Sequence, residues 1–411
     1  MLKISPTSRN EQMYLNLNVL LICFVLMTLS LSVLAQNQTL KFQHLSIEAG
    51  LSQSVVKVIH QDSLGFLWIG TEEGLNKYDG YRFTVYRHEP QDTHSLNHSK
   101  IFAIYEDSAG TLWIGTEAGL NRYDRRLDRF ESLSKLTVWS IYEDKSGILW
   151  IGTKGAGLNQ FDRETGQWLS YQHEPNNPKS LSHNAVWSIY QDNNGTLWIG
   201  TDGGGLNKFD YQSKHFTHYW PNAKNLNPLN NAITSIYEDH TGILWIGSIN
   251  GLHQFDRQRE TFEHYFPEAD NPNSLSHRAV WAIFEDSSGT LWVATDRGGL
   301  NQFDRQNNRF VHYQEDSSNP ASLNSNFILS LYQDRAGIVW IGTGGGGLNY
   351  FNPGQKKFSH YFHAPNNPNT LNNNDIFSLY ENFLSQIHFM NLKSITNCHI
   401  FVSCVYMWIY S

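Results

Sequence analysis

The residues best suited to chemistry in this sequence are polar and aromatic side chains that return at matched positions. Four similar segments, at 176–184, 270–278, 318–326 and 366–374, carry an Asn-Pro pair and precede an apolar stretch. The last residues of such segments and their counterparts are Ser99, Asn184, Asn231, Arg278 and Asn326. Three positions later stand Phe102, Trp187, Thr234, Trp281 and Leu329, with Trp139 and Lys57 at the matching points of other units. Aromatic rings stack on the apolar faces of sugars, and amides orient hydroxyl groups, so the pattern predicts a carbohydrate-binding surface.

Hairpin geometry explains four charged residues less easily, and we add them as candidate ligand contacts. They are Lys154, Asp202, Arg278 and Arg297. A structural explanation competes at the other positions. The aromatic residues can pack between neighbouring sheets, and the Asn-Pro segments can be turns in which Pro fixes φ and Asn bonds the backbone. The sequence leaves both explanations open.

Catalytic and metal chemistry have little support in the sequence. We find no carboxylate pair, no metal-ligand spacing of histidines and no Ser-His-Asp order, so we expect no catalytic residue, no metal and no cofactor. His88, His173 and His363 stand in Tyr-x-His or Phe-His strings at the ends of the expected outer strands, where solvent exposure is expected. The glycines at 344–347 resemble a phosphate loop, but no Gly-Lys-Ser/Thr follows them. We interpret them as a hairpin turn.

Composition narrows the class of protein further. The 411 residues include 17% charged and 14% aromatic residues, and the net charge is −8. This balance disfavours binding to nucleic acid or to an anionic membrane surface, and the few charges argue against long solvated helices. Cysteines occur only at Cys23, Cys398 and Cys404, so residues 36–397 have neither disulfides nor thiolate zinc sites.

A repeat of about 47 residues organises nearly the whole chain. The string YEDSAGTLWIGTEAGLNRYDR at 105–125 returns as YQDNNGTLWIGTDGGGLNKFDY at 190–211 and in five further copies. Their anchoring tryptophans are Trp68, Trp113, Trp150, Trp198, Trp245, Trp292 and Trp340. The spacings of 37 to 48 residues are close to those of a four-stranded propeller blade. The sequence therefore predicts an all-β, seven-bladed β-propeller of four-stranded antiparallel blades.

One unit, at 101–133, shows how each blade is built. Alternation predicts strands at 101–106, 111–116, 120–123 and about 129–133, with turns at Asp107–Gly110 and Gly119. The repeated Trp is expected to fill the interface between blades, and the repeated Asp and Gly to form a hairpin turn. The loops between second and third strands and the loops between blades share one face. The candidate residues at the starts of the inner strands should line the channel mouth on that face.

The strings LWIGT and GLN-x-FD, in seven tandem copies, closely resemble the two-component regulator propeller repeat, which occurs in the periplasmic sensor halves of hybrid histidine kinases. The resemblance covers about 40–380, although Trp292 is followed by Val-Ala and His253 replaces the usual Asn. It implies a periplasmic sensor of carbohydrate fragments in two-component signal transduction, truncated before the kinase and therefore not itself an enzyme. The expected partner is a small molecule or an oligosaccharide, and a homodimer stays open. Alternatives are a lyase of the streptogramin-inactivating kind and a protein-interaction scaffold.

Both ends of the chain differ from the repeats. Residues 1–35 are typical of a signal peptide: Lys3 and Arg9 precede an apolar run that ends at Ala35. Retention of this run as an uncleaved anchor is the alternative, and it would be the chain's only link to a membrane. We expect the propeller region at 40–380, with the start of an eighth repeat from residue 374, and a non-repeat tail at 381–411 that looks frameshifted or inserted.

Ring closure can be predicted by counting outer-strand strings. Each unit has one such string, and residues 40–45 form an additional one before the first unit. We expect residues 40–45 to pair as the outermost strand of the seventh blade. This closure removes an exposed sheet edge. In the alternative, the segment 357–363 holds that position.

Overall fold

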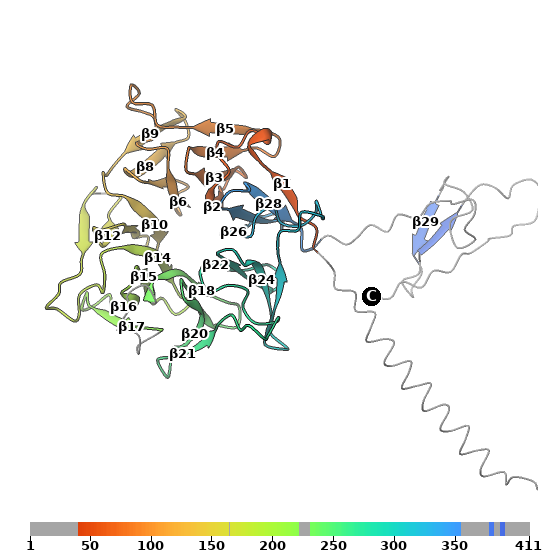
Figure 1. The fold of residues 1–411 in the computed structure, drawn as a ribbon. Coiled ribbons are helices and arrows are strands. Elements are labelled where there is room, and N and C mark those ends of the chain that lie inside the picture. The colour runs from red at the N-terminus through yellow and green to blue at the C-terminus, as the bar shows by residue number, and fades with distance from the viewer. Residues whose placement is uncertain (1–39, 164, 222–230, 355–377, 382–386, 391–411) are drawn as a thin grey trace, which may run out of the picture. The chain divides into compact units, whose positions relative to one another are not determined.

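Seven sheets surround one axis in the described part of the chain. The computed structural model describes residues 40–163, 165–221, 231–354, 378–381 and 387–390. Residues 43–351 form seven four-stranded antiparallel sheets, arranged as the blades of a propeller (Figure 1). The innermost strand of each blade contacts those of both neighbours, and the last contacts the first. The predicted seven-bladed propeller is confirmed.

The first three blades each use four consecutive strands, numbered from the axis outward. Blade 1 contains β2 (Val56–Gln61), β3 (Leu67–Thr71), β4 (Leu75–Tyr78) and β5 (Phe83–Tyr86). Blade 2 contains β6 (Ile101–Glu106), β7 (Leu112–Thr116), β8 (Gly119–Asp124) and β9 (Arg129–Ser132). Blade 3 contains β10 (Val138–Glu143), β11 (Leu149–Thr153), β12 (Leu158–Phe161) and β13 (Trp168–Tyr171).

The next three blades repeat this order. Blade 4 contains β14 (Val186–Gln191), β15 (Leu197–Thr201), β16 (Gly205–Phe209) and β17 (Phe216–Tyr219). Blade 5 contains β18 (Ile233–Glu238), β19 (Leu244–Ser248), β20 (Gly251–Asp256) and β21 (Thr261–Tyr265). Blade 6 contains β22 (Val280–Glu285), β23 (Leu291–Thr295), β24 (Gly299–Asp304) and β25 (Arg309–Tyr313).

Blade 7 is assembled from two distant parts of the chain. It contains β26 (Ile328–Gln333), β27 (Val339–Thr343), β28 (Leu348–Phe351) and, outermost, β1 (Gln43–Leu45). Strand β1 lies beside β28 (Figure 1) and runs antiparallel to it. Gln43 is opposite Tyr350. Phe42 adds an edge contact to Phe351, with ring centroids 5.4 Å apart. The predicted closure by 40–45 is confirmed over these residues, and the alternative segment 357–363 lies outside the described residues.

The core lies between the blades. Every residue of the second strands is buried, and each repeat Trp packs on apolar residues of the following blade. Trp68, for example, joins Leu75 of its own blade to Ile101 and Leu112 of blade 2. All seven repeat tryptophans are buried, from 0% to 6% exposed. The prediction that they fill the blade interfaces is confirmed.

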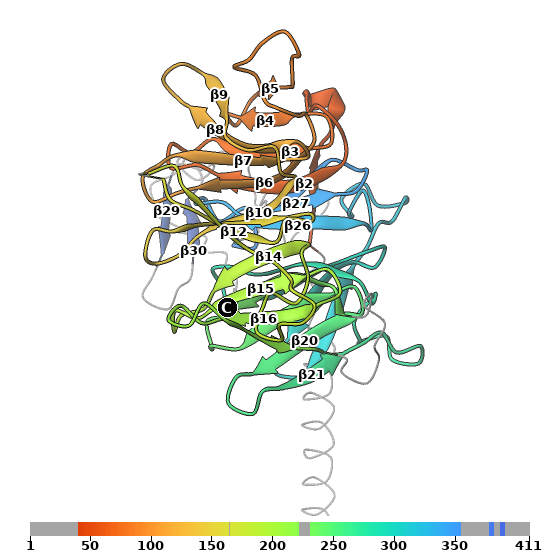
Figure 2. The same ribbon diagram turned by 90° about the vertical axis from the view of Figure 1, so that its left-hand side faces the viewer.

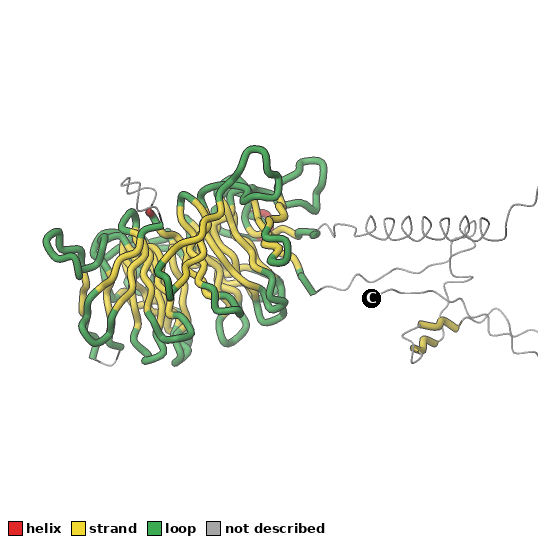
Figure 3. The backbone as a smooth tube through the Cα atoms, turned by 90° about the horizontal axis from the view of Figure 1, so that it is seen from below, coloured by secondary structure: helices red, strands yellow, loops and turns green. Residues whose placement is uncertain are grey.

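Loops gather on the two faces of the ring, because the strands run through its thickness (Figures 2 and 3). We call the face with the turns between first and second strands the turn face. The mouth face carries the turns between second and third strands and the loops between blades. Backbone bonds join these two kinds of loop on the mouth face, for example from the Glu117 N–H to the Lys100 carbonyl at 3.1 Å.

The remaining elements are short. The 3-10 helix η1 (Ile47–Ala49) follows β1. Residues 354–411 form a separate unit, in which β29 (Ser378–Glu381) pairs antiparallel with β30 (Ile387–Met390). Strand β29 falls within the predicted start of an eighth repeat, while residues 1–35 and 391–411 lie outside the described residues. Within the described ranges, no helix is long and apolar enough to cross a membrane.

Candidate functional site

A β-bulge interrupts the inner strand of every blade at its second residue. In blade 2, for example, the pairing with β7 skips Phe102 between Ile101 and Ala103. The skipped residues are Lys57, Phe102, Trp139, Trp187, Thr234, Trp281 and Leu329. A bulge re-aims a side chain out of the sheet pattern. All seven side chains are half-buried, whereas the residue before each is buried. We call these seven residues the axial layer.

The aromatic members of the axial layer contact one another around the axis. Trp139 lies edge-on to both Phe102 and Trp187, with ring centroids 6.5 and 5.7 Å apart. Trp187 and Trp281 stack at 5.5 Å with an interplanar angle of 13°. These two residues belong to blades 4 and 6, so their rings meet past the small Thr234 of blade 5. The structure therefore brings together four candidates that the sequence placed on four separate strands.

Phe327 extends this aromatic set, and the sequence analysis missed it. Its ring centroid lies 6.4 Å from that of Trp281. Phe327 stands one residue before β26, so the alignment of bulged positions does not include it. The sequence did contain a signal for Phe327, because blades 4, 5 and 6 have the small residue alanine at the corresponding position.

Two indole N–H groups of the axial layer have no partner among the described residues. They are Nε1 of Trp187 and Nε1 of Trp281, and both atoms are buried. The seven repeat tryptophans differ, because each donates from Nε1 to a carboxylate. A buried donor without an acceptor is costly, so these two groups favour an acceptor that is supplied from outside the chain.

A charged cluster adjoins the aromatic set at blades 1 and 2. Lys57 Nζ and Lys100 Nζ lie 3.2 and 3.6 Å from the same oxygen of Glu72. The two ammonium groups also lie 5.4 and 5.6 Å from the ring centroid of Phe102. Burial alone would raise the pKa of the Glu72 carboxyl, but the hydrogen bonds and charges of the two lysines outweigh it and lower that pKa. Glu72 and Lys100 were not among the candidates from the sequence.

The polar residues that end the Asn-Pro segments have a different use. Ser99 Oγ accepts a hydrogen bond from the His88 N–H at 3.0 Å, and Asn184 Oδ1 accepts one from the His173 N–H at 2.7 Å. Asn326 Oδ1 accepts from the Glu315 N–H at 2.7 Å. These contacts tie each loop back to the end of an outer strand, as the turn-making explanation expects. The structure does not gather these side chains with the axial layer, and Asn231 is buried.

The four charged candidates come from turns and loops of the mouth face, and the segments of Arg278 and Arg297 are joined by the bond from the Asp296 N–H to the Ala279 carbonyl at 2.9 Å. Lys154 is exposed and Asp202 is half-buried, each directly after a second strand. Arg297 Nε lies 3.9 Å from Asp296. Arg278 donates from Nη1 to Asn250 Oδ1 at 3.1 Å, and its guanidinium lies 5.7 Å from the ring centroid of Phe266.

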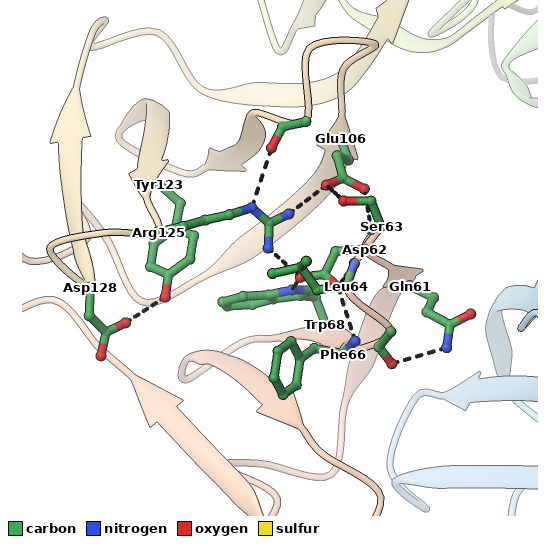
Figure 4. A network of polar contacts seen from close by, with 12 residues as sticks. Gln61, Asp62, Ser63, Leu64, Phe66, Trp68, Glu106, Tyr123, Arg125 and Asp128 are labelled. Atoms are coloured by element: carbon green, nitrogen blue, oxygen red, sulfur yellow. Dashed lines mark hydrogen bonds and ion pairs between the residues drawn. The ribbon is translucent and has the colours of Figure 1, made fainter.

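The turn face carries a polar network that joins neighbouring blades (Figure 4). Asp62 accepts from the Trp68 indole at 2.8 Å and from the Arg125 guanidinium of blade 2 at 2.6 Å. Arg125 also contacts Glu106, whose carboxylate accepts from the Ser63 N–H. Burial alone would raise the pKa of Asp62, but the bonds from Trp68 and Arg125 outweigh it and lower that pKa. The repeated Asp is therefore a structural turn residue, as predicted.

Histidine positions give little sign of catalysis. His88 and His173 are exposed, as expected, while His363 lies outside the described residues. His253, which replaces the usual Asn, is buried between Ser248 Oγ and His264 Nδ1, each 2.9 Å away. Burial, with a smaller effect from His264, lowers the pKa of His253 to about 3. No group of three or more potential metal ligands occurs among the described residues.

Known proteins resemble both the repeats and the ring. The family described as Two component regulator propeller matches residues 50–73, 95–118, 132–155, 180–203, 227–250, 274–297 and 322–345. The extracellular domain of the hybrid two component system BT3049 from B. thetaiotaomicron is 28% identical, with a TM-score of 0.67. The match covers 85% of this chain and 46% of that one. Histidine kinase P4 of Formosa agariphila is 46% identical over 69 residues, which are 17% of this chain and 5% of that protein.

A likeness of fold alone extends to an enzyme. Virginiamycin B lyase from Staphylococcus aureus is 15% identical, with a TM-score of 0.58 over 76% of this chain and 99% of that one.

The chain covers less than half the length of its two-component relatives. The seven matched stretches follow one another through the ring and end at each turn between second and third strands. Residues 50–345 therefore belong to the two component regulator propeller family.

Proposed function

We propose that this propeller is the extracytoplasmic, ligand-sensing part of a two-component signalling protein, and that it binds a carbohydrate fragment on the mouth face. The family assignment and the likeness to the extracellular domain of a hybrid two component system support the sensing role. We further propose export to the periplasm through the signal peptide at 1–35.

The axial layer is the observation that carries the proposed ligand class. Its bulged positions hold three tryptophans and one phenylalanine, and these rings are half-buried rather than enclosed between blades. Tryptophan and phenylalanine faces bind the apolar faces of sugar rings. Phe327 and the lysines at blades 1 and 2 extend the same surface.

Tryptophan substitutions test the proposal directly. The purified protein is screened against a set of oligosaccharides by the shift in melting temperature, and the best binder is titrated by calorimetry. We expect Trp139→Ala and Trp281→Ala to weaken binding roughly tenfold, because an aromatic contact contributes about 0.5–1.5 kcal/mol beyond its buried area. Trp220→Ala is the matched control, because Trp220 is 44% exposed beyond the end of β17.

The proposal fails if no oligosaccharide binds, or if the axial and control variants bind alike. Metal-dependent turnover of a streptogramin would instead favour the lyase alternative. If the protein neither binds an oligosaccharide nor turns over a streptogramin, a protein-interaction scaffold would describe it better.

A further inference from the structure

We propose that the ligand of the mouth face carries an anionic group, a carboxylate or a sulfate, and that Lys57 and Lys100 bind this group beside Phe102. The inference deepens the proposed function and rests on it. It names an acidic oligosaccharide, one that contains a uronate or a sulfate ester, as the ligand class.

The first argument is the balance of charge at blades 1 and 2. Lys57 and Lys100 share one oxygen of Glu72, so two ammonium groups face a single carboxylate. Among these three side chains one positive charge is therefore left over, and the lysine side chains are only 23% and 29% exposed. Partly buried charges are screened by salt less than exposed ones, so this excess charge can attract an anion effectively.

The second argument is the excess of hydrogen-bond donors in the axial layer. Lys57 and the three tryptophans can donate but not accept. The only other polar member, Thr234, already donates from Oγ1 to the Val280 carbonyl. The indole N–H groups of Trp187 and Trp281 also lack acceptors among the described residues, so the layer has more donors than acceptors. Carboxylate and sulfate groups have only acceptor oxygens.

The other acidic residues of this sector, Glu73 and Glu117, are more exposed than the two lysines, so salt screens their charges more strongly. Asp296 lies 3.9 Å from Arg297, and Glu117 lies 3.8 Å from His98. Asp202 belongs to blade 4, and its neighbouring aromatic residue in the axial layer is Trp187 rather than Phe102. The partly buried lysine charges therefore lie beside Phe102, next to the rings that would hold the sugar.

A purely structural role for the two lysines is the competing explanation. In that case they only neutralise Glu72, and their removal changes stability but not the choice of ligand. The two explanations therefore predict different ligand preferences, which an experiment can measure.

The test compares charged ligands with their neutral counterparts. An array of neutral, uronate-bearing and sulfated oligosaccharides is screened with the full-length protein. The best acidic binder is then titrated beside its methyl ester or its desulfated form, which tells a carboxylate requirement from a sulfate requirement. We expect the charged form to bind at least about tenfold more tightly, as a charge-assisted contact would give. We also expect this preference to weaken as the salt concentration rises.

Three variants locate the effect. The double substitution Lys57→Met with Lys100→Met should abolish the preference for the charged form, while Glu72→Gln should strengthen it by removing the competing carboxylate. Lys208→Met, at an exposed lysine on β16, should change nothing. Melting temperatures of all variants show whether each remains folded.

Each result decides a different claim. Equal binding of charged and neutral forms, or an unchanged preference in the double variant, would overturn the anionic ligand while leaving a sugar-binding propeller. If the double variant does not fold, the response of Glu72→Gln decides: an unchanged preference there overturns the inference. Absence of binding to every oligosaccharide would overturn the proposed function itself.

Discussion

The two faces of the ring use the same repeat in opposite ways. On the turn face, all seven blades place an Asp against the indole of the repeat Trp. On the mouth side, the corresponding bulged positions hold Lys, Phe, Thr, Leu and three Trp residues. A structural requirement that recurs seven times is met by one residue type, whereas an asymmetric ligand requires different residues in different blades. Variation within one chain therefore separates residues that build the ring from residues suited to recognition.

The turn face also forms an unbroken belt between blades. In every blade the N–H after the repeated Asp donates to the Glu or Gln that ends the next inner strand, and Arg335 to Gln61 completes the circle. Where Gln replaces Glu, the position equivalent to Arg125 holds Gly80, Tyr211 or Pro353 instead of arginine. At the interface of blades 3 and 4, Tyr211 instead donates to Asp144, and Lys145 donates to the Asp192 carbonyl. On this face, the loss of the Glu–Arg pair at the interface of blades 3 and 4 is thus compensated by other hydrogen bonds between the blades.

The sharpest test of the comparison replaces one repeat Trp and, in a separate variant, one Trp of the axial layer. Trp150→Ala should lower the free energy of unfolding by about 3–5 kcal/mol, because it removes a fully buried ring from a blade interface. Trp187→Ala, in the axial layer, should cost much less stability and should instead weaken ligand binding. Denaturant unfolding monitored by circular dichroism measures the difference. Equal losses of stability would remove the distinction between the two sets of tryptophans.

A second test examines ring closure, on which both faces depend. The double substitution Gln43→Cys with Tyr350→Cys, at direct partners across β1 and β28, should form a disulfide under oxidising conditions. The link should raise the free energy of unfolding by about 2–4 kcal/mol. Non-reducing electrophoresis and denaturant unfolding check this. Gln43→Cys with Lys208→Cys, on blades 7 and 4, is the control, and crosslinking there instead would contradict the observed register.

A third test concerns the arginine bridges of the turn face. Arg125→Met should cost about 1–3 kcal/mol at neutral pH, since it unpairs the buried Asp62, with a discount because Arg125 is 24% exposed. Arg122→Met, in an exposed pair with Glu131, should cost less than about 1 kcal/mol. Denaturant unfolding of both variants measures the contrast. Equal losses of unfolding free energy would show that the Arg125 bridge stabilises the protein no more than the exposed pair.

The same bridge predicts a dependence on pH. The pKa of Asp62 is lowered in the folded protein, so its stabilising contribution is present above the ordinary value of 3.8 and is lost as the pH falls through the lower folded value. The difference between wild type and Arg125→Met should therefore shrink in strong acid. A difference that stays constant down to about pH 2 would exclude this linkage.

The smallest effect is expected where blade 5 departs from the repeat. His253→Asn restores the usual residue and should change stability by no more than about 1 kcal/mol near neutral pH. The folded pKa of His253 is about 3, whereas the unfolded imidazole protonates near 6.5. Acid therefore favours the unfolded wild type between these values, and the Asn variant should lose less stability as the pH falls from about 6.5 to about 4. Equal acid sensitivity of the two proteins would refute this.

The sequence predicted most of the ring and part of the candidate site. Seven copies with fixed turn residues determine the blades, and counting outer strands locates β1. Alignment of the inner strands also found the axial layer, because every bulge falls at the same position. It could not find Glu72 beside Lys57 and Lys100, since these residues come from two blades and three different parts of the repeat. It also missed the Trp187–Trp281 stack, which depends on the small size of Thr234 in an intervening blade.

Closure of blade 7 by β1 also imposes an order of events during synthesis. His44 contacts Asn349, which is 305 residues later in the chain. At the usual rate of translation, β1 therefore waits roughly 15–60 s before its partner strand exists. Blades 1 to 6 can form during that time, but the edge of β28 can be covered only at the last step. The sequence Gln-His-Leu of β1, short and mostly polar, suits a segment that must stay soluble and unpaired until the ring is ready to close.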